Sequence, residues 1–209
     1  MNTISEETWL EWIDRLSDQH YVLIDQVIPD RTFAEIKTYY QSLLTQEEFA
    51  KAGIGTLQDF QIDKNIRGDW VYWLDRERDK PLTGFFSLID EWIARLNRYC
   101  YLSISDSEFH LAYYPPGTFY KRHLDQFREQ NNRLISLVFY LNEKWQPGDG
   151  GELKIYQDDR EILVEPLGNR LVLFKSDLVE HEVMMTYQGR ESLTGWLLYQ
   201  PAGLGFLAR

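Results

Sequence analysis

Two histidines and an aspartate form the most informative chemical pattern in this chain. His123 and Asp125 are separated by one residue, and His181 and then Arg190 follow later. Two imidazoles and one carboxylate can hold a divalent metal while leaving coordination positions open, which is typical of non-heme Fe(II) oxygenase sites. A guanidinium such as that of Arg190 can bind a carboxylate through two parallel hydrogen bonds. The pattern therefore predicts oxygen chemistry that uses iron and a keto acid.

The spacing of these residues sets conditions on the elements that carry them. Residues i and i+2 of a β-strand point to the same face, so His123 and Asp125 can reach one ion while Leu124 faces away. His181 must then come from a different strand. The same alternation places Arg190 and Ser192 on one face, where both can contact one carboxylate. Each motif alone is weak, but together they predict a metal site.

Composition and charge limit the classes of partner. The chain has 209 residues and a formal net charge of −11, which would repel a polyanion. This argues against a nucleic-acid partner, including a nucleic-acid demethylase function. A single cysteine, Cys100, excludes an intramolecular disulfide and fits a reducing compartment. We find neither a signal pattern nor an apolar stretch of membrane-spanning length, so we expect a cytoplasmic protein with no membrane partner.

The first half of the chain has mainly helical periodicity. Thr3 and Glu6 fit a capping box ahead of a first helix, and Asp30 can cap a second. We expect a short strand over Tyr21–Val27 and a third helix over Phe85–Tyr99. We interpret residues 1–104 as a mainly helical support region.

From Glu108 onward the apolar period becomes two, with turn signals between short runs. The expected strands are Glu108–Tyr114, Thr118–Asp125, Arg133–Leu141, Glu152–Tyr156, Glu161–Glu165, Arg170–Lys175, His181–Met184 and Ser192–Tyr199. Eight short strands preceded by helices predict an α+β protein, with a double-stranded β-helix (jelly roll) core over 105–209 and helices buttressing one sheet. Without repeats or linkers, we treat 1–209 as a single domain.

Further segments extend the pattern beyond the metal ligands. They are Ile66-Arg67-Gly68-Asp69 with Trp73, Tyr114-Pro115, Tyr120–Asp125, Phe139–Asn142 with Trp145, Gly150–Leu153, Leu173–Asp177, His181–Val183, Arg190 and Trp196. In order and spacing they resemble the 2-oxoglutarate- and Fe(II)-dependent prolyl hydroxylases, specifically the oxygen-sensing prolyl hydroxylase domain branch. The resemblance covers most of the chain after about Ile66.

The resemblance implies a role for each matching residue. It implies that Fe(II) is bound by His123, Asp125 and His181, and that the distal carboxylate of 2-oxoglutarate is bound by Arg190 and Tyr140. The other implied co-substrate contacts are Tyr114, Leu153, Thr194 and Trp196, with Thr194 near a metal-bound water. Ser192 is a further expected contact because it shares a strand face with Arg190. The implied substrate-side residues are Arg67 and Asp69, in a loop that covers a peptide, and Arg133 near the peptide entrance.

The implied reaction hydroxylates a prolyl residue in a peptide or protein and converts 2-oxoglutarate to succinate. Its cofactors would be Fe(II), 2-oxoglutarate and O2, with ascorbate bound in support of turnover. Three alternatives stay open: the same chemistry on free proline, another amino acid or a small metabolite; a cupin-like metal-binding sensor without turnover; and a zinc hydrolase, which Arg190 and the flanking segments disfavour. The oligomeric state is not indicated.

The chain departs from the family in two places near the substrate entrance. The turn after Tyr114 is shorter than in the animal enzymes, and a charged string occupies Asp75–Lys80. These departures put the substrate identity in doubt. His110 shares a strand face with Tyr114, which makes it a candidate to line the pocket. We expect it instead to be a core histidine whose hydrogen bonds are satisfied.

Overall fold

A computed structural model describes residues 4–52, 66–126, 132–157 and 160–199. Within them the helices are α1 (Glu6–Gln19), α2 (Asp30–Thr45) and α3 (Thr83–Cys100), with a 3-10 turn, η1, at Lys80–Leu82. No described helix is long and apolar enough to cross a membrane. The first predicted helix is present as α1, and its N-cap is Ser5, whose hydroxyl accepts a hydrogen bond from the Thr8 N–H at 3.1 Å. Thr3 lies outside the described residues.

The strands form two antiparallel sheets. The larger sheet has seven strands in the order β1-β9-β6-β11-β4-β3-β2, and the smaller has the order β5-β10-β7-β8. Their bounds are β1 (Tyr21–Asp25), β2 (Ala50–Lys51), β3 (Trp70–Trp73), β4 (Asp106–Tyr114), β5 (Tyr120–His123), β6 (Arg133–Tyr140), β7 (Leu153–Gln157), β8 (Arg160–Val164), β9 (Arg170–Lys175), β10 (Glu180–Val183) and β11 (Arg190–Leu198).

Each of the eight strands expected after Glu108 is present, with ends within two residues of the expectation. The first half contributes more β-structure than expected, because β2 and β3 were not predicted. Strand β3 pairs with β4, and β1 pairs with β9 at the other side of the large sheet. The N-terminal half therefore extends this sheet as well as covering it.

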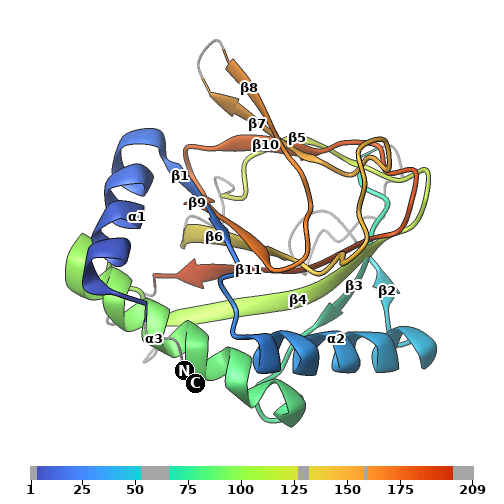
Figure 1. Ribbon diagram of the computed structural model, residues 1–209, viewed down its shortest axis with the longest axis horizontal. Helices are drawn as coiled ribbons and strands as arrows, with labels where there is room; N and C mark the ends of the chain where they lie inside the picture. The colour runs from blue at the N-terminus through green and yellow to red at the C-terminus, as the bar shows by residue number, and fades with distance from the viewer. Residues whose placement is uncertain (1–3, 53–65, 127–131, 158–159, 200–209) are drawn as a thin grey trace, which may run out of the picture.

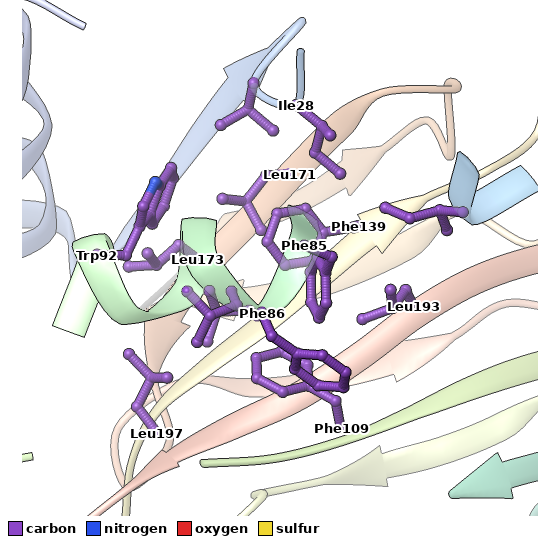
Figure 2. Close-up of a cluster of buried hydrophobic side chains, with 14 of the residues drawn as sticks. Ile28, Phe85, Phe86, Trp92, Phe109, Phe139, Leu171, Leu173, Leu193 and Leu197 are labelled. Carbon is purple, nitrogen blue, oxygen red and sulfur yellow. The ribbon is translucent and has the colours of Figure 1, made fainter. Parts of the chain in front are cut away.

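Alternation along the central strands separates two apolar clusters. On β6, Ile135, Leu137 and Phe139 join the cluster that contains the helices, whereas Val138 and Tyr140 join the cluster between the sheets. Figure 2 shows the helix-side cluster, in which aromatic rings of α3 lie against the large sheet. Phe85 makes edge-to-face contacts with the rings of Phe109 and Phe139, at centroid distances of 5.1 and 5.6 Å.

These clusters give a layered structure, with helices on one side of the large sheet and the small sheet on the other (Figure 1). The arrangement confirms the predicted α+β jelly roll with helices buttressing one sheet. Its functional consequence is an interior between the two sheets, into which alternate residues of β4, β6, β11 and the small sheet point.

Candidate metal and co-substrate site

The three predicted metal ligands lie together in this interior. His123 ends β5 and His181 lies in β10, and the two residues are direct cross-strand neighbours. Asp125 lies beyond the strand, so the predicted extension of β5 to Asp125 is wrong. The chain leaves β10 here because the Gln126 N–H donates to the Ser176 carbonyl at 3.2 Å. This turn brings Asp125 to the two histidines.

The donor atoms are arranged for a shared ion. The Asp125 Oδ1 lies 3.4 Å from His123 Nε2 and 3.7 Å from His181 Nε2, and one ligand atom from each residue lies within 4.8 Å of the others. The Nδ1 atom of His123 is hydrogen-bonded to the Lys121 carbonyl at 2.7 Å, and that of His181 to the Val179 carbonyl at 3.0 Å. Since a carbonyl only accepts, Nδ1 carries the proton and Nε2 presents its lone pair. The residues therefore fit Fe(II).

The ionisation states suit metal binding. Burial acts to raise the pKa of Asp125, but His181, His123 and the Ser136 hydroxyl lower it more strongly, to well below its usual range. Burial lowers the pKa of His181 to about 4, against the attraction of Asp125. An ionised carboxylate and a neutral imidazole are the forms that bind a metal.

Two buried serines behind Asp125 were not identified from the sequence. The Ser136 hydroxyl donates to Asp125 Oδ2 at 2.7 Å and lies 2.8 Å from the Ser176 hydroxyl. Both serines are fully buried. The available signal was the position of Ser136, a polar residue within the apolar run Leu134–Phe139 and on the same strand face as Val138 and Tyr140.

Arg190 lies on the inward face of β11 with 2% of its surface exposed. Its Nε donates to the Gly151 carbonyl at 2.9 Å, and its Nη1 reaches the Ser192 hydroxyl at 3.3 Å, as the shared strand face predicted. No carboxylate in the described part of the chain forms an ion pair with it. A buried, unpaired cation is costly, so this guanidinium is suited to an anionic ligand.

Two tyrosine rings flank the guanidinium of Arg190. Its Cζ lies 4.8 Å from the Tyr114 ring centroid and 5.1 Å from that of Tyr140. The Tyr140 hydroxyl is buried and has no hydrogen-bond partner among the described residues. Burial raises the pKa of Tyr140, which keeps the phenol protonated and able to donate. Arg190 and Tyr140 thus offer donors to the same ligand.

Gly151 has a function in the site that its turn signal did not reveal. Its φ is +77°, a backbone conformation that favours glycine. In addition, a Cβ at this position would lie 2.9 Å from the Cδ of Arg190. Only glycine therefore lets the backbone approach closely enough for its carbonyl to hold the arginine.

The other residues expected to contact the co-substrate also lie in the interior. Leu153 is buried in the cluster between the sheets, and the Thr194 hydroxyl lies 3.3 Å from that of Ser192. Trp196 follows two residues later on the same face of β11, opposite Ser136 on β6. One face of β11 therefore extends from the unpaired cation to the neighbourhood of the metal ligands, since Ser136 bonds to Asp125. Its residues are Arg190, Ser192, Thr194 and Trp196.

The residues expected on the substrate side are close to the ligands and already paired. Arg67 forms a two-pronged ion pair with Asp69, at 2.8 and 2.5 Å, and its Cζ lies 4.4 Å from the Tyr120 ring. Tyr120 stacks on the ring of His123 at a centroid distance of 3.7 Å. This chain of contacts connects the Arg67–Asp69 pair to a metal ligand.

Arg133 is held at the opposite side of the ligand cluster. It pairs with Glu108 at 2.7 Å, donates to the Asp125 carbonyl at 3.2 Å, and lies 3.6 Å from the Trp196 ring. It therefore supports both Asp125 and Trp196.

His110 differs from the expectation. It is buried, as a core histidine should be, but its Nδ1 has no hydrogen-bond partner among the described residues, so the expected satisfaction is wrong at this atom. Its ring contacts those of Trp73 and Trp196, at centroid distances of 4.9 and 5.4 Å, and the two tryptophan rings are 6.2 Å apart.

Comparison with known proteins agrees with this geometry. Residues 109–198 match the model of the 2OG-Fe(II) oxygenase superfamily. A Pseudomonas putida prolyl-4-hydroxylase structure is 33% identical with a TM-score of 0.83, covering 92% of this chain and 99% of that one. A Trichoplax adhaerens prolyl hydroxylase, solved with a hypoxia inducible factor peptide fragment, is 26% identical with a TM-score of 0.82, covering 92% and 90%.

The family implies Fe(II), 2-oxoglutarate and O2, and the His–Asp–His cluster fits that metal. Membership of this oxygenase family also argues against the two other hypotheses for the same ligand set, a zinc hydrolase and a non-enzymatic metal-binding sensor. The chain belongs to the 2-oxoglutarate- and Fe(II)-dependent dioxygenases, and among them it is of the prolyl hydroxylase type.

Proposed function

We propose that this enzyme hydroxylates a prolyl residue in a peptide or protein and couples that step to the decarboxylation of 2-oxoglutarate to succinate. The observation that carries the proposal is the buried Arg190, which lacks a carboxylate partner in the described part of the chain and lies in the same interior as the metal ligands. The prolyl substrate is supported by the similarity to the Pseudomonas and Trichoplax enzymes.

Binding of 2-oxoglutarate follows from the unpaired donors. Arg190 and Tyr140 would bind the far carboxylate, since both are buried and both have unused donor capacity. Gly151 and Ser192 hold the guanidinium in place, and the Tyr114 ring covers one side. A cation held in a dry interior binds an anion more strongly than one in water.

The metal ligands define the reacting end. When bound by His123, Asp125 and His181, Fe(II) supplies the oxygen activation that makes an unreactive C–H bond susceptible to hydroxylation. The protein keeps Asp125 ionised and His181 neutral, and Ser136 holds one carboxylate oxygen away from the histidines. Burial of this cluster excludes bulk water from the reacting atoms. We further propose that ascorbate supports turnover by keeping the iron reduced.

The substrate side is proposed to lie between the Arg67–Asp69 pair and Arg133. These residues contact the surroundings of His123 and Asp125 respectively, so a peptide between them would present one side chain to the metal. Trp73 is half exposed and extends the aromatic surface outward from Trp196. A partly exposed aromatic surface is suited to a prolyl ring and its flanking chain.

The test begins with the proteins of the source cell. Mass spectrometry of wild-type and deletion strains should reveal a prolyl residue that gains one oxygen atom only when the gene is present. A synthetic peptide around that residue should then stimulate succinate release by purified enzyme with Fe(II), 2-oxoglutarate and ascorbate. Free L-proline is the parallel arm. Stimulation by free proline alone would reject the peptide substrate, and an equal rate with His123→Ala would reject the assigned site.

A further inference from the structure

A buried histidine without an assigned role, His110, lies against Trp73 and Trp196, which form the aromatic surface proposed for the substrate. His110 is 4% exposed, and its Nδ1 is buried without a hydrogen-bond partner among the described residues. Buried polar atoms are nearly always hydrogen-bonded, and leaving one unpaired costs free energy. The same situation at Arg190 points to a ligand, and His110 calls for the same explanation.

The position of His110 limits which ligand that is. On β4 it lies opposite Thr194 of β11 and opposite Trp73 of β3. Its ring forms a cluster of three with those of Trp73 and Trp196, and Trp73 is 49% exposed. His110 is therefore near the metal level of the interior but on the side that reaches the surface, away from Arg190. A substrate held against Trp73 and Trp196 would lie next to His110.

The electrostatic surroundings keep this histidine neutral. Burial lowers the pKa of His110 to about 3, and the nearby Arg67 lowers it in the same direction. A neutral imidazole has one N–H donor and one acceptor. It offers a hydrogen bond without carrying a charge, which suits an uncharged polar group of the ligand.

We propose that His110 is a substrate-binding residue whose Nδ1–H donates a hydrogen bond to a backbone carbonyl of the bound polypeptide, at the target proline or at the residue before it. This proposal rests on the proposed prolyl-peptide function. A prolyl residue has no backbone N–H and offers only carbonyl oxygens. The protein atom that binds its backbone must therefore be a donor, and this fixes the proton on Nδ1.

The experiment compares three substitutions that separate donor position from ring packing. His110→Leu removes both nitrogens, His110→Asn keeps an N–H donor at the place of Nδ1, and His110→Gln moves the donor to the place of Nε2. The probe is the synthetic peptide that wild-type enzyme hydroxylates. Binding is followed by tryptophan fluorescence in anaerobic enzyme loaded with Mn(II) and 2-oxoglutarate, and KM and kcat are measured separately with Fe(II).

We expect His110→Leu to weaken peptide binding and raise the peptide KM by about 5- to 100-fold, the range for an unmade buried hydrogen bond. His110→Asn should recover most of the loss and His110→Gln should not. The affinities for Mn(II) and 2-oxoglutarate should stay unchanged in all three.

Modified peptides identify the carbonyl. Replacing its oxygen by sulfur, at the proline or at the residue before it, weakens the acceptor. One of these thioamide peptides should bind wild-type enzyme more weakly than the parent peptide does. The same thioamide peptide and the parent peptide should bind His110→Leu with equal affinity. Equal peptide affinities for wild type and His110→Leu, or equal losses in Asn and Gln variants, would overturn the inference and leave the proposed function intact. If no prolyl peptide is hydroxylated by the wild type, the proposed function itself fails.

Discussion

The two serines behind Asp125 allow the clearest quantitative prediction. An ionised carboxylate only accepts hydrogen bonds, so the Ser136 hydroxyl must donate to Asp125 Oδ2. The Ser136 oxygen then accepts from Ser176, 2.8 Å away. This chain holds Oδ2 and leaves Oδ1 facing both histidines. Ser136→Ala should therefore release Asp125 and weaken metal binding.

The magnitude follows from the type of hydrogen bond that is lost. A hydrogen bond to a charged group contributes about 1.5–3 kcal/mol, which corresponds to about a 10- to 150-fold change in affinity. Loss of a residue that orients a metal ligand typically weakens metal binding by about 10- to 100-fold. The two ranges overlap at about 10- to 100-fold, and we expect Ser136→Ala to weaken metal binding by a factor in this overlap. Ser176→Ala removes a bond between neutral groups, worth about 0.5–1.5 kcal/mol, so its effect should be about 2- to 10-fold.

The assay is isothermal titration of metal-free protein with Mn(II), repeated with Fe(II) under anaerobic conditions. Ser87→Ala is the matched control, because the hydroxyl of this exposed serine on α3 bonds, among the described residues, to the Thr83 carbonyl alone. Ser136→Thr keeps a hydroxyl and should retain most of the affinity, and circular dichroism checks that each variant is folded. Equal metal affinity for Ser136→Ala and wild type, or a larger loss in Ser176→Ala, would refute the reasoning.

Three further predictions use other buried groups. Arg190→Lys keeps the charge but loses the planar fork, so the Kd for 2-oxoglutarate should rise by at least about 10-fold in a titration, and an unchanged Kd would place the anchor elsewhere. Asp79 is fully buried and accepts hydrogen bonds from two tyrosine hydroxyls and a backbone N–H, so Asp79→Ala should lower the free energy of unfolding, measured in urea, by about 2–4 kcal/mol. The control Glu77→Ala loses an exposed ion pair and should change this free energy by less than about 0.5 kcal/mol. Equal effects of the two substitutions would contradict the role of Asp79. The pKa values of His110 and His181 are lowered to about 3 and about 4, so the unfolded chain binds more protons below about pH 6.5. As the pH is lowered, the free energy of unfolding of the metal-free protein should therefore decrease by up to about 1.4 kcal/mol per pH unit for each histidine. His110→Leu should reduce this slope, and an unchanged slope would contradict the buried, neutral state of His110.

Much of the fold was predictable because its signals are local. The apolar run Leu171–Phe174, bounded by Arg170 and Lys175, was sufficient to predict β9 with both ends correct. Strand β3 was missed because Trp70–Trp73 is a four-residue strand that depends on pairing with β4, far along the chain. The end of β5 was misplaced because it depends on a bond between Gln126 and Ser176, which no local pattern reveals.

The same distinction applies to the site. The metal ligands and Arg190 were identifiable because their residue types and order are specific to one chemistry. The supporting residues were not, since Ser136 and Ser176 resemble ordinary serines until their strands pair. The carbonyl of Gly151 contacts an arginine that lies far along the chain. The unsatisfied His110 became visible only when its neighbours were known.

The central claim is that His123, Asp125, His181 and Arg190 form one site for Fe(II) and 2-oxoglutarate. The most direct measurement is anaerobic titration of the Fe(II)-loaded protein with 2-oxoglutarate, followed by visible absorption. Wild-type protein should develop a metal-to-ligand charge-transfer band, Arg190→Ala should require much more 2-oxoglutarate for the same band, and His181→Ala should give none. Absence of the band in wild type, or an equal band in His181→Ala, would contradict the assigned site.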